Sequence, residues 1–308
     1  MRHIIIGILF ISFLFLAACN DSQQTSNESE DGNEEENSKQ EQDGNNQEDV
    51  SKDEDEEDED AEDKDDKEDE STANKEEQET EKEPIYKVDS ETSSIVPLDD
   101  SGDTNEKVVL LTIDDVPDKN AIKMAETLKE HNASAIFFVN GHFIDTEEGA
   151  EKLKKIHEMG FPIGNHTYSH PDLTTISEEE QTEEIVSVSD RIEEIIGERP
   201  SFFRAPHGKN TDHSREIAKE EGMTIMNWTY GYDYFEPYMD AEKIKQAMIS
   251  GEGPEAGVDY SLLKPGANLL MHDRDWTSEA LGDIIEGLRE KDYEMVDPNL
   301  IQTTRNAS

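Results

Sequence analysis

The sequence predicts an α/β fold, a distorted (β/α)7-type barrel, for residues 107–304. Two observations predict it: short apolar segments recur along this part of the chain, and amphipathic helical patterns lie between them. The apolar segments do not alternate with polar residues, so we expect strands that are buried on both faces, as in a parallel sheet. An open doubly wound sheet is the competing arrangement. It is disfavoured because no glycine-rich phosphate loop follows the first strand.

Seven strands are expected in this region. The first, at 107–113, is a continuous run of β-branched residues and leucine, and the second, at 135–139, is equally apolar. Seven strands in about 200 residues fit a barrel slightly smaller than the eight-stranded form. The remaining strands are expected at 161–164, 202–203, 223–228, 267–271 and 293–296.

Helical patterns separate the strands, which implies a parallel sheet with helices outside it. The clearest pattern opens with a capping box from Ser177 to Glu180, carries Ile185 and Val188 on one face, and ends at Gly197. Further amphipathic patterns lie at 121–128, 150–156, 211–221 and 281–288.

The charge of the chain is unevenly distributed. Its 308 residues carry 77 Asp and Glu against 28 Lys and Arg, a net charge of -49, and only 32% of them are hydrophobic. Residues 20–84 hold 31 acidic residues and 6 lysines but no aromatic residue and no histidine. Such a segment cannot bury enough apolar surface to offset its ordering entropy, so we expect residues 19–84 to be a disordered acidic tether. The excess of acid also excludes nucleic acid as a partner, because the protein would repel phosphate.

The first residues are typical of an exported lipoprotein. A short basic start precedes an apolar run at 4–16, which has the length of a signal-peptide core and is short for a membrane span. Cys19, the single cysteine, follows Leu16-Ala17-Ala18, which resembles a bacterial lipobox. We therefore expect residues 1–18 to be a lipoprotein signal peptide. Lipidated Cys19 would anchor the protein at the extracellular face of the bacterial cell membrane, with residues 85–106 as a lead-in segment to the catalytic domain. A plain secretory signal is the alternative.

Polar residues gather where the predicted strands end. In parallel α/β barrels the active site lies at the carboxyl ends of the strands. Five of the nine histidines follow predicted strands, a placement that chance would rarely produce. The residues at these positions are Asp114, Asp115, His142, His166, His170, Arg204, His207, Asp233 and His272.

The types of these residues indicate a metal centre with acid–base groups beside it. His166 and His170 have the HxxxH spacing, which alone is a weak metal signal. Two histidines and one carboxylate that leave a coordination position open are typical of a catalytic metal site. Neighbouring residues on an extended chain point to opposite sides, so we expect one of Asp114 and Asp115 to bind metal while the other faces the attacking water. The alternative, a solvated acidic turn, is disfavoured by the buried strand that precedes the pair.

These motifs resemble those of the polysaccharide deacetylase family, carbohydrate esterase family four. The resemblance covers residues 108–296, and the family's fold is a distorted β/α barrel. Five short motifs occur in the family's order: Thr112 to Pro117, His166 to His170, Arg204 to Gly208, Asp233-Tyr234 and Leu270 to His272. Each motif is short, but their joint order at strand ends is specific.

The resemblance implies roles for the metal and base residues. Asp115, His166 and His170 would bind a divalent metal, usually zinc, with cobalt or nickel in some members. Asp114 would be the general base that takes a proton from the attacking water. Arg204 would pair with Asp114 and keep it ionised, since a nearby cation favours the charged carboxylate.

The resemblance also implies roles on the acid and substrate side. His272 would be the general acid, and Asp233 would orient it and favour its charged form. His207 would direct its backbone N–H to the oxyanion, while Leu270 and Tyr234 would line the acetyl pocket. The chain departs from the family pattern at His207, where tyrosine is frequent, and at Tyr234, where tryptophan is usual.

The implied activity is metal-dependent hydrolytic N-deacetylation of N-acetylglucosamine residues in an extracellular polysaccharide. Peptidoglycan is the polymer nearest to an anchored enzyme, and we expect a monomer. Val116 stands where the family has glycine, but no polar group is missing, which favours an active enzyme. His142 is expected to contact substrate or support the structure rather than bind metal. Two alternatives stay open: an O-acetyl esterase on acetylated xylan or wall polymers, and a non-catalytic glycan- or metal-binding lipoprotein.

Overall fold

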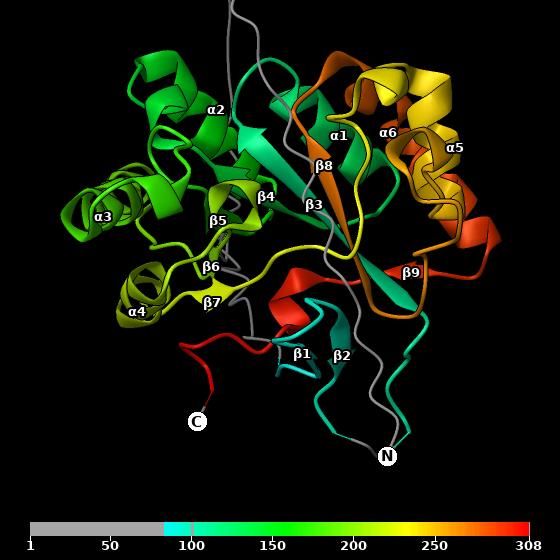
Figure 1. Ribbon diagram of the computed structural model, residues 1–308, viewed down its shortest axis with the longest axis horizontal. Coiled ribbons are helices and arrows are strands. Elements are labelled where there is room, and N and C mark those ends of the chain that lie inside the picture. Colours follow the sequence, from blue (N-terminus) through cyan, green and yellow to red (C-terminus); the bar gives the residue numbers. More distant parts are fainter. Residues whose placement is uncertain (1–82, 100–101, 308) are drawn as a thin grey trace, which may run out of the picture. The chain divides into compact units, whose positions relative to one another are not determined.

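A curled parallel sheet forms the centre of the protein (Figure 1). The structure is a computed structural model and describes residues 83–99 and 102–307. The strand order of the sheet is β7-β6-β5-β4-β3-β8, and β9 pairs with the first residues of β3 in the same seven-stranded sheet. All pairings within it are parallel, so the predicted α/β barrel-type fold is confirmed. The strands are β3 (Val108–Val116), β4 (Ala135–Val139), β5 (Ile163–Asn165), β6 (Phe202–Phe203), β7 (Thr224–Ile225), β8 (Ala267–His272) and β9 (Glu294–Met295).

The two ends of the strand order meet just beyond β7. Tyr230 forms an isolated parallel bridge with Leu269 of β8. The backbone N–H of Leu270 donates to the carbonyl of Tyr230 over 2.9 Å. The strand expected at 223–228 is therefore shorter than predicted, because the chain leaves β6 after Ile225 and crosses to β8. This crossing closes the sheet into a distorted barrel.

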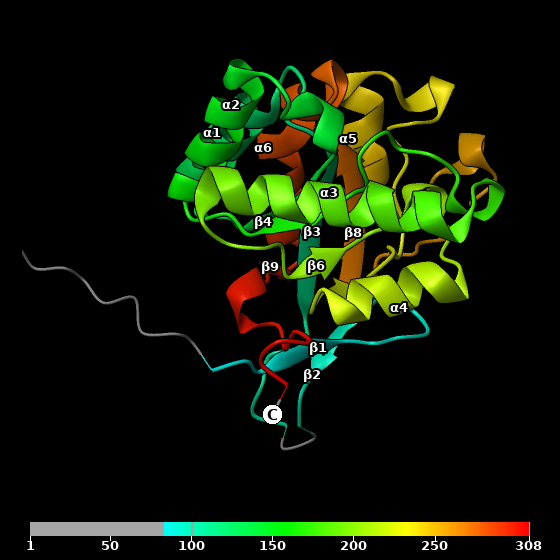
Figure 2. The ribbon, with the colours of Figure 1, turned by 90° about the vertical axis from the view of Figure 1, so that its left-hand side faces the viewer.

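In the part of the chain that the structure describes, six α-helices surround the sheet (Figures 1 and 2). The capping box at Ser177 and the left-handed residue Gly197 bound the longest of them, as predicted. Ala241–Ser250 (α5) had no predicted counterpart, because its buried face consists of Ile244, Ala247 and Met248, a weak apolar pattern. The helices are α1 (Ala121–Glu130), α2 (Glu147–Glu158), α3 (Glu178–Ile196), α4 (Asp212–Glu220), α5 and α6 (Asp275–Glu290). Among the described residues, no helix is both long and apolar enough to cross a membrane.

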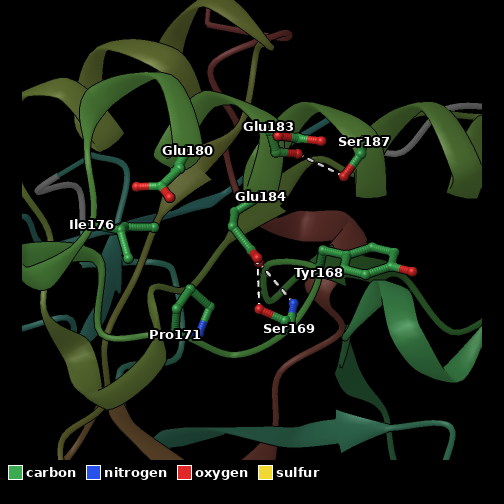
Figure 3. A pocket seen from close by; sticks show the side chains of 8 residues that line it. All are labelled: Tyr168, Ser169, Pro171, Ile176, Glu180, Glu183, Glu184 and Ser187. Carbon is green, nitrogen blue, oxygen red and sulfur yellow. Dashed lines mark hydrogen bonds between the residues drawn. The ribbon is translucent and has the colours of Figure 1, made fainter.

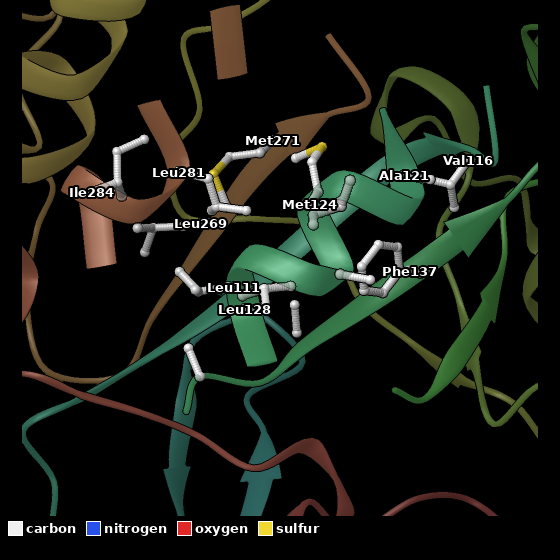
Figure 4. Packing of buried hydrophobic residues seen from close by; sticks show 14 of the residues in the cluster. Leu111, Val116, Ala121, Met124, Leu128, Phe137, Leu269, Met271, Leu281 and Ile284 are labelled. Carbon is white, nitrogen blue, oxygen red and sulfur yellow. The ribbon is translucent and has the colours of Figure 1, made fainter. Parts of the chain in front are cut away.

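Two cores lie on the two faces of β3, because its side chains alternate between them. Leu111 and Ile113 belong to the outer core, where the sheet packs against α1 and α6 (Figure 4). Leu110 belongs to the inner core, inside the barrel, together with Phe138 of β4. Each of these side chains is fully buried, and burying a leucine or phenylalanine contributes about 1.5–3 kcal/mol. β3 is therefore apolar on both faces up to the site, except at Thr112.

A short hairpin covers the end of the barrel where the strands begin. Tyr86–Val88 (β1) and Ile95–Pro97 (β2) pair antiparallel, and Tyr86 also bridges to Ile301 near the end of the chain. No strand is expected between 85 and 106 from the sequence, because three-residue strands carry too little periodicity. Ile95 packs into the inner core, and its N–H donates to the carbonyl of Gly266 over 2.7 Å. The hairpin thus seals the barrel at the end opposite to the carboxyl ends of the strands.

Candidate active site

The carboxyl end of β3 holds both aspartates in an irregular stretch of strand. The register between β3 and β4 shifts between Ile113 and Val116, and Asp115 has a positive φ of 60°. As a result both carboxylates approach His166: its Nε2 lies 3.5 Å from Oδ2 of Asp114 and 3.9 Å from Oδ1 of Asp115. The expectation that the two side chains point to opposite sides was wrong, because a bulge and a left-handed residue redirect the second one. Such a backbone outlier indicates a functional constraint at this position.

Asp114 forms a buried ion pair with Arg204, the residue that follows β6. Arg204 Nη1 donates to Asp114 Oδ1 over 2.7 Å, and the exposed fractions of the two side chains are 0% and 2%. Arg204 also donates to Thr112 and to the carbonyl of Asn227, and the Phe138 ring lies 4.3 Å from its guanidinium carbon. Burial raises the pKa of Asp114 above its usual range, and Arg204 limits that rise. Asp114 is therefore a carboxylate fixed in position by Arg204, with a proton affinity above that of an exposed aspartate.

Asp115, His166 and His170 form a cluster that fits a metal ion. One ligand atom from each lies within 4.8 Å of the other two. His166 Nδ1 lies 2.7 Å from the carbonyl of Arg204, which can only accept, so Nδ1 carries the proton and Nε2 is free to bind metal. Burial and the charge of His170 lower the pKa of His166 to about 3, and burial also lowers the pKa of His170. Both rings are therefore neutral, the form in which histidine coordinates a metal.

The spacing of the three ligands is close to that of a bound ion. Asp115 Oδ1 lies 3.7 Å from Nε2 of His170 and 3.9 Å from Nε2 of His166. Ligands at about 2.0–2.2 Å from one zinc ion are themselves separated by roughly 3–3.5 Å. A small inward shift of the side chains would satisfy that geometry. Two imidazoles and one carboxylate are also a donor set that suits zinc.

His272 and Asp233 form a second charged pair across the site. His272 Nδ1 lies 2.7 Å from Asp233 Oδ1, and the backbone N–H of His272 donates to Asp233 Oδ2 over 2.7 Å. The Thr277 hydroxyl also donates to Asp233 Oδ2, and the indole N–H of Trp276 donates to the backbone carbonyl of Asp233, whose side chain is fully buried. Burial alone would lower the pKa of His272, but the attraction of Asp233, with that of Asp114 and Asp115, raises it to about 9. His272 is therefore protonated at neutral pH, with Nε2 as its free donor.

The remaining predicted residues lie around this centre at different depths. The ring of exposed His207 stands edge-on to His170, with 4.9 Å between the ring centroids, and its φ is 58°. Tyr234 is 42% exposed, and its ring centroid is 5.6 Å from that of His272. Leu270 is buried in β8 two residues before His272. His142 does not join the metal cluster: its Nδ1 lies 2.8 Å from the carbonyl of Tyr168, so it contacts the loop between the two metal-cluster histidines.

Two residues beside His272 were missed from the sequence. Asp273 accepts hydrogen bonds from the backbone N–H groups of Asp118, Asn120 and Ala121, over 3.0, 2.6 and 2.9 Å. Arg274 Nη2 donates to Oδ2 of Asp115 over 2.8 Å. Both directly follow β8, so the rule that singled out the other strand-end polar residues applies to them too. Their partners, however, come from β3, the loop after it and the start of α1, which no local pattern indicates.

A surface pocket adjoins the loop that carries the two metal-cluster histidines, and Figure 3 shows it. It has a volume of about 420 Å³ and lies between α3 and the segment that begins at Tyr168. Neither His166 nor His170 lines it. Glu184 in its wall accepts from the N–H and the hydroxyl of Ser169, over 2.7 and 2.6 Å. These bonds fix the loop between His166 and His170 to α3. The pocket therefore lies beside the metal cluster and is not part of it.

Comparison with known proteins places the chain in a family. A family model for polysaccharide deacetylase matches residues 101–226. A peptidoglycan-N-acetylglucosamine deacetylase of Bacillus cereus is 31% identical over 211 residues, which are 67% of this chain and 72% of that protein. PdaA of Bacillus subtilis, a peptidoglycan-N-acetylmuramic acid deacetylase, is 28% identical over 198 residues, 62% of this chain and 70% of that protein.

A solved structure extends the likeness to the fold. The crystal structure of BA3943, a CE4 family pseudoenzyme from Bacillus anthracis, aligns with a TM-score of 0.54 at 28% identity. The alignment covers 62% of this chain and 63% of that one, less than two thirds of its length. Together with the 31% identity over 72% of the Bacillus cereus protein, these matches establish the family. The chain belongs to the polysaccharide deacetylase family, a family of deacetylating hydrolases.

Proposed function

We propose that this chain is a metal-dependent N-deacetylase of N-acetylglucosamine residues in an extracellular polysaccharide, with peptidoglycan as its polymer. One observation carries the proposal: the Asp115–His166–His170 cluster, the Asp114–Arg204 pair and the His272–Asp233 pair lie together at one end of the barrel. Relatives named as peptidoglycan-N-acetylglucosamine and peptidoglycan-N-acetylmuramic acid deacetylases support peptidoglycan as the substrate.

The metal in this proposal is zinc, with cobalt or nickel as alternatives. Asp115, His166 and His170 would hold it through one carboxylate oxygen and two Nε2 atoms. When bound, the ion would polarise the acetyl carbonyl and activate water as a nucleophile near neutral pH. This ligand set would leave positions open for substrate and water.

Asp114 would act as the general base. Arg204 occupies its Oδ1, so Oδ2, on the side of His166, is the oxygen that would take the proton from the attacking water. The hydroxyl of that water would add to the acetyl carbon. The elevated pKa of Asp114 makes this carboxylate a stronger base than an exposed aspartate.

His272 would act as the general acid. Its Nε2 would donate a proton to the amide nitrogen while the C–N bond breaks, so that acetate and a free amine leave. Asp233 holds the Nδ1 side of the ring and stabilises its charged form. The backbone N–H of His207 would donate to the oxyanion, and Leu270 and Tyr234 would line the acetyl-methyl pocket.

The decisive experiment is an acetate-release assay on the purified full chain with zinc. Peptidoglycan and N-acetylchitooligosaccharides are the amide substrates, and acetylated xylan is the ester substrate assayed beside them. We expect acetate release from the amide substrates, and we expect it to disappear in Asp114→Asn and after chelation of the metal. The control Glu216→Gln, at an exposed surface position, should keep it. Release from the ester alone would replace the proposal with an O-acetyl esterase.

A non-catalytic role is the second candidate, because BA3943, which this chain resembles, is called a pseudoenzyme and a mutant of it has restored activity. Tight glycan binding without acetate release under zinc, cobalt or nickel would establish that role. In this chain no polar member of the site is missing, which favours turnover.

The cellular location is part of the proposal. It includes a signal peptide at residues 1–18, a lipid on Cys19 and a tether at residues 19–84. These parts lie outside the described residues, except for Glu83 and Pro84 at the end of the tether. A lipid anchor at Cys19 would hold the enzyme at the outer face of the cell membrane, within reach of the wall polymer.

A further inference from the structure

Arg274 and Asp115 form an ion pair at the edge of the metal cluster. Arg274 Nη2 lies 2.8 Å from Oδ2 of Asp115, and the side chains are 35% and 16% exposed. The other oxygen of the carboxylate, Oδ1, faces Nε2 of His170 at 3.7 Å and Nε2 of His166 at 3.9 Å. The two oxygens of Asp115 therefore have different partners, a guanidinium on one side and two imidazoles on the other.

We propose that Arg274 is a positioning residue that holds Asp115 as a one-oxygen metal ligand, an inference that rests on the metal site of the proposed function. A free carboxylate rotates about its Cβ–Cγ bond and can offer a metal one oxygen or both. A guanidinium has rigid, planar donors, so a bond to Oδ2 fixes the carboxylate plane. Oδ1 is then the oxygen that points to the two histidines before any ion binds.

The backbone of Arg274 is fixed on both sides, which makes it a suitable support. Its N–H donates to the carbonyl of His272 over 2.8 Å, and its carbonyl accepts from Ser278 in the first turn of α6 over 2.9 Å. The preceding residue, Asp273, is buried and accepts three backbone hydrogen bonds from the start of α1 and the loop before it. Arg274 thus extends from a rigid junction between β8 and α6 toward the end of β3.

With the Arg274–Asp115 pair, each of the two adjacent aspartates has an arginine partner. Asp114 and Asp115 are adjacent carboxylates, and each receives a guanidinium from the end of a different strand, Arg204 after β6 and Arg274 after β8. Two neighbouring carboxylates repel each other, and a guanidinium beside each one offsets that repulsion. The bond from Arg274 also orients the Asp115 carboxylate.

Positioning and simple electrostatics predict opposite effects on metal affinity. A cation near a divalent ion repels it, so loss of the Arg274 charge alone would tighten binding. Loss of a positioning contact weakens binding, and outer-shell partners of metal ligands typically contribute about 10–100-fold to affinity. The sign of the change therefore separates the two explanations.

The test is calorimetric titration of zinc into the metal-free full chain, with the cobalt absorption spectrum as a second readout. We expect Arg274→Gln to weaken zinc binding about 10–100-fold and to alter the cobalt spectrum, with Arg274→Lys between it and the wild type. Arg215→Gln, which removes the same charge from the exposed face of α4, should leave both unchanged. Far-ultraviolet circular dichroism of the metal-free variants confirms that they are folded.

The outcomes distinguish this inference from the proposed function. If the wild-type chain binds zinc and Asp115→Asn does not, the metal site stands. Zinc binding by Arg274→Gln that is as tight as in the wild type, or tighter, would then overturn the role of Arg274 alone. A wild-type chain that binds no zinc would overturn the metal site and the role of Arg274 together.

Discussion

Asp114 and His272 are register partners on the adjacent parallel strands β3 and β8. Burial raises the pKa of Asp114, while His272 has a pKa of about 9 because three carboxylates surround it. The sheet thus holds a carboxylate with a raised pKa beside an imidazole with a raised pKa. Under the proposed function the carboxylate would serve as the base and the imidazole as the acid, as in other enzymes with such paired groups.

Removal of the Arg204 cation should impair the base. In Arg204→Met the Asp114 carboxylate would be buried without its partner, so its pKa would rise further and less of it would be ionised at a given pH. We expect kcat/KM at neutral pH to fall about 10²–10⁴-fold, the usual contribution of general base catalysis. The acidic limb of the pH–rate profile should move to higher pH. Arg204→Lys, which keeps the cation, should retain more activity, and an unmoved acidic limb in Arg204→Met would contradict this role.

Loss of the Asp233 carboxylate should lower the pKa of His272. In Asp233→Asn the ring would keep its burial, which disfavours the charge, but lose its closest anion. Proton NMR titration of His272 in the metal-free chain should show a pKa well below 9, and the alkaline limb of the pH–rate profile should move to lower pH. An unchanged titration of His272 would show that Asp233 does not set its charge.

The same pair should make stability depend on pH. The folded-state pKa of His272 is raised from 6.5 to about 9, so its stabilising effect is fully present below pH 6.5 and is lost as the pH rises through 9. The difference between 6.5 and about 9 corresponds to at most about 3.5 kcal/mol, using roughly 1.4 kcal/mol per pKa unit. Denaturant unfolding of the metal-free chain between pH 6 and 10 measures it, with Asp233→Asn as the variant in which the slope should flatten.

Asp273, which directly follows β8, should stabilise the protein by capping the start of α1, although the two are far apart along the chain. Asn120 precedes α1 but makes no side-chain cap, and Asp273 instead accepts from the N–H groups of Asp118, Asn120 and Ala121. Asp273→Ala would leave these donors without their partner, at a cost of about 1–3 kcal/mol. Thermal unfolding should show a lower midpoint in Asp273→Ala and a smaller decrease in Asp273→Asn. Equal midpoints in all three proteins would exclude a capping role.

The proposed anchor at Cys19 predicts where the protein is found. In Cys19→Ser no thioether-linked lipid could form, so the protein should appear in the culture medium instead of the membrane fraction. Immunoblots of both fractions, with Asn20→Ser as the neighbouring control, measure this. Continued retention of Cys19→Ser by the membrane would count against the anchor.

The sequence predicts the strands that carry the site because they are buried on both faces. Ahead of the site, β3, β4 and β8 are mostly apolar, with Thr112 and Asn268 as buried polar residues, and their ends were placed within three residues. The polar residues after them could be found by position alone. The hairpin β1–β2 and helix α5 could not, since three-residue strands and an alanine–methionine face give weak periodic signals.

The details of the site depend on contacts that a local pattern does not contain. The directions of Asp114 and Asp115 follow from a register shift against β4 and from a left-handed residue, not from strand alternation. The partner of Arg274 comes from a different strand, 159 residues away along the chain. Residue types and strand ends were therefore predictable, whereas the orientation of side chains required the packed barrel.

The hairpin β1–β2 also marks where the described chain enters the folded body. It closes the end of the barrel where the strands begin, and the described chain starts beside it at Glu83. The chain therefore enters the folded body at the end of the barrel where the strands begin, while Asp114 and His272 lie at the carboxyl ends of β3 and β8. The entry point of the described chain and the candidate site are thus at opposite ends of the barrel.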